Sequence, residues 1–332
     1  MKKLTHLSLT TLIIISCSKK HYKQDHTIAI PEVLNDKASV YCERAYQHYK
    51  SDGYVHHKCD SVGFTSLYAR ACQHLDIDLT KFEDSQGKLY RDPNHSCFPH
   101  DSKAESSKDM TLMRMTAAWY LKDLSWVKRF LGFVEKNNYK FCEAVDKKTE
   151  LSTCVLSYSL LSLLYDMRDK LNNLPTKYNP DDIENENILD LHNSSDSVLD
   201  ELAKSINYVG YRAHLAVLKI DLAGSIYGYV SSSQRSLLQK LAEREPLNGL
   251  YQMAWAKWGD GTFGQAFDAL LDESHFPLDR LPNNHEHHCT KYLYQRDMLK
   301  DGLPNPDWMP CPNDPLDEHP GTEVPFTLSL IK

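Results

Sequence analysis

Apolar residues in this 332-residue chain recur with helical spacing through most of its length. The clearest stripe sets them at i, i+3, i+4, i+7, i+8 and i+11, on one face of a helix that opens at Asp60-Ser61, and it comprises Phe64, Leu67, Tyr68, Ala71, Cys72 and Leu75. The segment from Asp109 to Tyr120 is apolar on most sides. Comparable stripes begin at Val127, Leu156, Tyr208, Leu237 and Phe263, the last behind the capping residue Thr262. No sustained alternation of apolar and polar residues bounded by hairpin turns occurs, and strands do not alternate with helices. The sequence therefore predicts an all-α fold.

The strongly apolar helices follow one another at intervals of about 40 to 55 residues, with a more polar helix in most intervals. A final apolar segment follows Glu323, and the earlier helices begin near Asp60, Asp109, Leu151, Asn207 and Gly249. This rhythm predicts a closed ring of helical hairpins, with inner helices buried on all sides and outer helices half exposed. An open α-solenoid or an irregular helical bundle is the alternative. Helical periodicity resumes unchanged after the Asn/Asp-rich stretch 172–198, so we expect a surface loop there and a single domain over 31–332.

The N-terminus has the layout of an export signal. Met1 to Lys3 are positively charged overall, and residues 4–16 carry no acid, Lys or Arg and end in an apolar run. This run is too short to span a membrane but fits a signal peptide over 1–16. The segment Ile14-Ile15-Ser16-Cys17 resembles the bacterial lipoprotein signal, the lipobox. The resemblance implies a lipid on Cys17, and Ser18 favours the outer membrane. We expect residues 17–30 to include a flexible tether. An ordinary signal peptide that ends near a cysteine is the alternative.

The composition of the chain excludes two classes of protein, those with many membrane spans and those that bind nucleic acid. A mean hydropathy of −0.52 excludes a protein with many membrane spans. The chain has 38 Lys+Arg against 45 Asp+Glu and a formal net charge of −7, so it lacks the basic excess that nucleic acid binding requires. We expect a monomer that contacts the membrane through its lipid.

Export places the cysteines in an oxidising compartment. Eight cysteines remain beside Cys17, and an even number there indicates disulfides without fixing their pairing. The pair we predict first is Cys289 with Cys311, which brackets a Pro-rich loop. Cys72 lies in an apolar helical stripe and is interpreted as a buried free thiol. No C-x-x-C pair is present, which disfavours a zinc ribbon or a thioredoxin-like role.

Several short blocks carry a resemblance to a known group of proteins. They resemble the recurring blocks of bacterial and phage proteins with an (α/α) toroid, which are similar to six-hairpin glycosidases. The blocks are Cys59-Asp60-Ser61 with 64–68, Gly87 to Pro93, Ser107 to Met110, Trp308 to Pro312 and His319 to Glu323. The resemblance implies an (α/α) toroid for the domain. It implies the reaction less strongly, because toroids include hydrolases, lyases and non-enzymes.

Acidic residues at the expected starts of inner helices are the candidate catalytic groups. Asp60, Asp109 and Glu323 hold such positions. If the inner helices run parallel, their N-termini meet at one mouth, and residues far apart in sequence converge there. Paired carboxylates are what glycoside hydrolysis needs, one as general acid and the other as the base that activates water. The alternative for each acid is a helix cap without a catalytic role.

Other side chains are expected around the same mouth. The candidate substrate-binding residues are Arg91, Lys108, His319, Tyr90 and Trp308, the aromatic ones as stacking faces for sugar rings. A Tyr or His base with an Arg or Lys clamp would suit a polysaccharide lyase acting on uronates. A lipoprotein that binds a glycan or a protein without catalysis is the third possibility. We expect no cofactor and no metal, since the ligand-type residues of 283–289 match no standard metal-site spacing.

Overall fold

The computed structural model describes residues 28–55, 60–73, 75, 77–94, 105–142, 155–180, 210–273, 276, 299–300, 303–304 and 323–332. These residues are predominantly helical, which confirms the all-α prediction. The α-helices are α1 (Glu32–Tyr49), α2 (Ser61–Ala71), α3 (Lys108–Tyr120), α4 (Leu124–Lys136), α5 (Tyr158–Leu171), α8 (Gly210–Tyr227), α9 (Ser232–Arg244), α10 (Gly249–Trp258), α11 (Phe263–Leu271) and α12 (Glu323–Leu328). A 3-10 helix, η1 (Leu79–Phe82), follows α2, and two short antiparallel strands, β1 (Leu299–Lys300) and β2 (Leu303–Pro304), pair Leu299 with Pro304.

The helices fall into two kinds by burial. In α2 the residues from Ser61 to Arg70 are all buried, and α3 is buried from Met110 to Ala118. In contrast, α4, α9 and α11 bury only one face. The apolar stripes in the sequence account for the second kind, because an amphipathic helix covers a core with one side. Helices that are buried all round must be enclosed by others.

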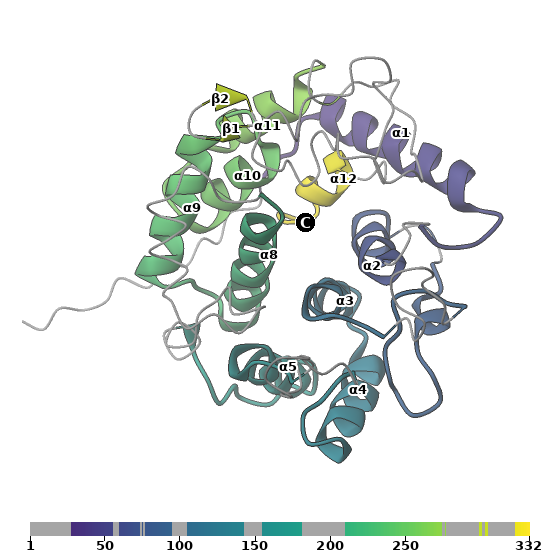
Figure 1. The fold of residues 1–332 in the computed structure, drawn as a ribbon. Helices are drawn as coiled ribbons and strands as arrows, with labels where there is room; N and C mark the ends of the chain where they lie inside the picture. The colour runs from purple at the N-terminus through teal and green to yellow at the C-terminus, as the bar shows by residue number, and fades with distance from the viewer. Residues whose placement is uncertain are drawn as a thin grey trace, which may run out of the picture.

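Contacts between the helices run in a closed cycle. Helix α2 packs against α3, α3 against α5 and α8, α5 against α8, α8 against α10, α10 against α12, and α12 against α2. Around this cycle, α1 contacts α12 and α11, α4 contacts α3 and α5, and α9 contacts α8 and α10. Figure 1 shows the same order, with α3, α8 and α12 toward the middle and α4 and α9 toward the periphery.

Two neighbouring helices of the cycle, α2 and α3, point the same way along their axes. Near the N-termini of α2 and α3, Gly63 lies so close to Met110 that a Cβ there would be 2.6 Å from the methionine sulfur. At the other end, the Arg70 guanidinium lies 3.6 Å from the ring centre of Tyr120. The N-terminal ends of the two helices are therefore close together, and so are their C-terminal ends. This means that α2 and α3 are parallel.

The same test applies to α8 and α10. The ring of His214, in the first half of α8, lies 5.2 Å from that of Tyr251 near the start of α10. Near their last turns, Lys257 Nζ of α10 donates to Asp221 Oδ1 of α8 at 2.7 Å. These two helices are therefore parallel as well.

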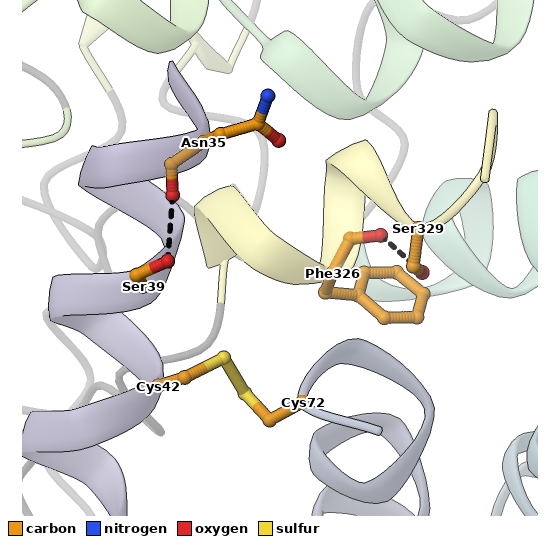
Figure 2. Close-up of a disulfide and its surroundings, with 6 residues drawn as sticks. All are labelled: Asn35, Ser39, Cys42, Cys72, Phe326 and Ser329. Carbon is orange, nitrogen blue, oxygen red and sulfur yellow. Dashed lines mark hydrogen bonds between the residues drawn. A yellow bond between two sulfur atoms is a disulfide. The ribbon is translucent and has the colours of Figure 1, made fainter. Parts of the chain in front are cut away.

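A disulfide joins α1 to the end of α2. Cys42 in α1 is bonded to Cys72, the residue after α2, with their Cα atoms 5.7 Å apart, and α12 lies beside this bond (Figure 2). The interpretation of Cys72 as a free thiol is wrong. A half-cystine that is bonded to another helix occupies an apolar position just as a buried thiol does, so the stripe could not separate the two. Cys142 is also disulfide-bonded.

The region before α2 holds a helix that the apolar stripes did not point out. The buried positions of α1 have helical spacing, yet many of them are Ala or Tyr rather than large aliphatic residues. Ile28 and Ile30, at the end of the expected tether, pack against the core. Among the described residues, no helix is both long enough and apolar enough to span a membrane.

Candidate functional site

Two polar clusters lie at opposite ends of the parallel helices. The N-terminal cluster consists of Asp60, Lys88, Tyr90, Arg91 and Glu105, around the start of α2. The C-terminal cluster consists of Arg70, Tyr120, Asp221, Lys257 and Trp258. The first contains sequence-predicted site residues, and the second was not predicted.

Asp60 stands at the N-cap position of α2 but makes no capping hydrogen bond with its side chain. Instead, Arg91 Nη1 donates to Asp60 Oδ1 at 3.2 Å. The backbone fixes this arrangement, because Val62 N donates to the Arg91 carbonyl at 2.9 Å and Arg91 Nε donates to the Glu105 carbonyl at 2.9 Å. The two paired side chains are 35% and 28% exposed, so solvent or a ligand reaches this ion pair.

The other members of this cluster, Lys88, Tyr90 and Glu105, lie on or next to a short antiparallel bridge. Tyr90 pairs with Glu105 across an antiparallel bridge, and Lys88 Nζ donates to Glu105 Oε1 at 2.5 Å. The Lys88 ammonium also lies 5.5 Å from the centre of the Tyr90 ring. Burial raises the pKa of Tyr90, and the nearby Asp84 adds to this rise while Lys88 opposes it. Tyr90 therefore holds its proton firmly.

The start of α3 follows the same bridge. The N-cap of α3 is Ser107, so the helix begins at Lys108, and Asp109 lies in its first turn. The Ser107 hydroxyl donates to Asp109 Oδ1. Lys108 is buried and Asp109 is half-buried. The structure thus places Asp60, Tyr90 and Arg91 together at the start of α2, with Asp109 in the first turn of the neighbouring helix.

Several predicted site residues lie outside the described residues. Glu323 is the first residue of α12, but its side chain is not described. The others outside the described part of the chain are the proposed lipidation site Cys17, the predicted pair Cys289 and Cys311, Trp308 and His319.

The C-terminal cluster is built on the carboxylate of Asp221 in α8. Arg70 Nη2 and the Tyr120 hydroxyl each donate to Oδ2 at 2.9 Å. Lys257 Nζ and Trp258 Nε1 donate to Oδ1 at 2.7 Å and 3.0 Å. Both Arg70 and Asp221 are completely buried, and the Arg70 guanidinium lies between the rings of Tyr120 and Phe326. Four donors from α2, α3 and α10 thus converge on one carboxylate.

The charges in this cluster are strongly coupled. Burial on its own would raise the pKa of Asp221, but the nearby Lys257 and Arg70 charges outweigh that effect and lower it to about 2. For Lys257, burial opposes the charge, yet Asp221 raises its pKa above the usual value. Asp221 and Lys257 therefore favour their charged forms.

The sequence contained a signal for this second cluster. Charged residues inside helices that are otherwise apolar must be paired when the helix is buried. Arg70, Asp221 and Lys257 are such residues. The signal did not say which of them pair, because Arg70 and Asp221 are 151 positions apart.

Neither cluster has the composition of a metal centre. Within the described ranges, no group of three or more His, Cys, Asp or Glu side chains could hold a metal ion. Comparisons with protein-family models, with curated proteins and with solved structures found no match to this chain.

Proposed function

We propose that the protein is an exported lipoprotein whose helical body is a single (α/α) toroid that acts on a carbohydrate polymer. The closed cycle of helix contacts supports the toroid, as do the enclosed helices α2 and α3. In an open solenoid each unit would contact only its neighbours along the chain. Here α12 contacts α1 and α2, which joins the two ends of the chain.

The proposed lipid on Cys17 has a direct test. We expect the full-length chain, expressed in a bacterial host, to incorporate labelled palmitate and to fractionate with the outer membrane. Cys17→Ser should abolish the label. Labelling that persists in Cys17→Ser would contradict this assignment.

The carbohydrate site is proposed at the N-terminal cluster, and Asp60 carries the argument. Its carboxylate does not cap its own helix, is held by Arg91 and is 35% exposed. A fixed and accessible carboxylate can orient a water molecule or accept hydrogen bonds from sugar hydroxyls. Because this carboxylate is held in place and is accessible, we assign Asp60 the role of base. Asp109 or Glu323 is then the general acid.

The raised pKa of Tyr90 favours hydrolysis over elimination. A lyase that used Tyr90 as its base would need this hydroxyl to lose its proton easily, and burial works against that. Arg91 bonds to Asp60, so its first role is to position that carboxylate.

A glycan-degradation screen tests the proposal. The panel contains peptidoglycan, neutral polysaccharides and uronate polymers, and the proteins are wild type, Asp60→Asn, Asp109→Asn and the control Asp268→Asn, which removes an exposed carboxylate from α11. We expect new reducing ends from wild type and the control, and about a hundredfold less or lower from Asp60→Asn.

Other results have distinct meanings. Equal product from wild type and Asp60→Asn would contradict the role of Asp60. Products with unsaturated ends, which absorb ultraviolet light, would show a lyase. Binding to a polymer without any product would show a non-catalytic receptor.

A further inference from the structure

Four tyrosines gather on the surface beside α5. Tyr158, the first residue of α5, is 46% exposed, and Tyr139, which follows α4, is 43% exposed. Tyr165 and Tyr178 are half-buried. We call Tyr139, Tyr158, Tyr165 and Tyr178 the tyrosine platform.

The platform consists of two pairs of tyrosines that α5 connects. The rings of Tyr158 and Tyr178 meet edge to face with their centres 5.7 Å apart. Tyr158 and Tyr165 are seven positions apart on α5, so they share one helix face about 10.5 Å apart along the axis. The Tyr139 hydroxyl lies beside that of Tyr165. The spacing along α5 is comparable to the length of a disaccharide in an extended chain.

Carboxylates fix one hydroxyl and one backbone segment of the platform. The Tyr165 hydroxyl donates to Glu135 Oε1 at 2.8 Å. The segment after α5 is fixed by the buried carboxylate of Asp166, which accepts from Lys177 N at 2.7 Å and from Tyr178 N at 3.0 Å. The Tyr227 hydroxyl donates to the same carboxylate at 2.8 Å. A buried acid thus anchors the backbone that presents Tyr178, which lowers the entropy cost of binding to it.

We propose that the tyrosine platform is a second glycan-binding surface, which holds an extended neutral polysaccharide by stacking sugar rings on tyrosines. Exposed rings with fixed hydroxyls offer an apolar face and a polar edge, and a sugar ring presents the same combination. The exposed Glu135 lies at the edge of the Tyr165 ring, whose hydroxyl it accepts from. This proposal shares with the proposed function only the class of ligand, and it does not depend on turnover at Asp60.

The test is affinity electrophoresis of the full-length chain through gels that contain a neutral polysaccharide, taken in turn from a panel. We expect at least one polysaccharide to retard wild type. The double variant Tyr158→Ala/Tyr178→Ala should weaken that binding about tenfold, whereas Tyr158→Phe, which keeps the ring, should bind like wild type. Tyr46→Ala is the matched control, because Tyr46 is 41% exposed on α1, outside the platform.

Each result decides the proposal. Retardation that is lost in the double variant but kept in Tyr46→Ala supports it. Equal retardation of the double variant and wild type overturns it, and so does a wild type that no neutral polysaccharide retards. A double variant that changes only the oligomeric state in size-exclusion chromatography also overturns it, since the platform would then be a protein contact. The degradation screen measures product formation and is independent of the electrophoresis. A negative result in the electrophoresis therefore does not bear on the role of Asp60.

Discussion

Asp60 and Asp221 are both carboxylates paired with arginine, and they stand near opposite ends of parallel helices. Asp221 is completely buried and accepts hydrogen bonds from four side chains, two of them cationic. Asp60 is 35% exposed, and its arginine is partly exposed as well. A buried carboxylate whose oxygens accept hydrogen bonds only from protein donors stabilises the fold. A carboxylate that is held in place and is still accessible can bind a ligand. From this difference we expect the C-terminal cluster to stabilise the fold, and we propose the N-terminal cluster as the site of function.

The largest expected effect comes from Asp221→Asn. This change leaves the cations of Arg70 and Lys257 together without their shared anion, and breaking a buried ion pair costs about 3–5 kcal/mol. Urea unfolding should show this loss in the free energy of unfolding. Asp60→Asn is the matched control at the other end, with an expected loss of about 1 kcal/mol or less. Similar losses in both variants would remove the distinction between the two clusters.

Removal of the disulfide should have the next largest effect. Cys42 and Cys72 are 30 positions apart, and closing a loop of that length stabilises a fold by about 3–4 kcal/mol. The double variant Cys42→Ala/Cys72→Ala should therefore unfold at lower urea concentration. The turnover that we propose at Asp60 should persist under conditions where the variant is folded. Loss of turnover from the folded variant would show that the bond also supports the site.

Acid should weaken the contribution of the C-terminal cluster to stability. The folded-state pKa of Asp221 is lowered to about 2, so its contribution to stability is complete above the unfolded-state pKa of about 4 and is lost as the pH falls toward 2. Thermal unfolding of wild type between pH 7 and pH 2 should show this loss. In Asp221→Asn the dependence on pH in that window should be shallower. If the stability of the two proteins changed with pH in the same way, the proposed interaction of Asp221 with Lys257 and Arg70 would be contradicted.

The smallest effect on stability is expected for Arg91→Lys. The partly exposed pair with Asp60 contributes about 1 kcal/mol or less to folding. Lysine keeps the charge but cannot bond to Asp60 and to the Glu105 carbonyl with one planar group. We therefore expect the melting temperature to stay nearly constant while turnover falls about tenfold. A variant with full activity would show that Arg91 does not position Asp60.

The fold class could be predicted from the sequence because helical periodicity is a local property of the chain. The stripe from Phe64 corresponds to α2, and Thr262 caps α11 as expected, accepting from Gln265 N. The candidate site was predicted in part, because Asp60 and Arg91 were expected at the same mouth and the structure shows them in contact.

What the sequence did not reveal depends on contacts between distant segments. The bond between Cys42 and Cys72 and the four donors on Asp221 are examples. Spacing along one helix reports which face is buried, but it does not report what that face meets. For the same reason, the tyrosine platform was not visible before Tyr158 and Tyr178 were brought together.

The last helix has a consequence for the order of folding. Helix α12 lies within the final ten residues and contacts α1, α2 and α10. The circuit of helices therefore cannot close until α12 is available. Contacts between the two ends of a chain form slowly, because they restrict the longest possible loop. Loss of residues 323–332 should therefore leave the circuit open and remove a neighbour from α1, α2 and α10.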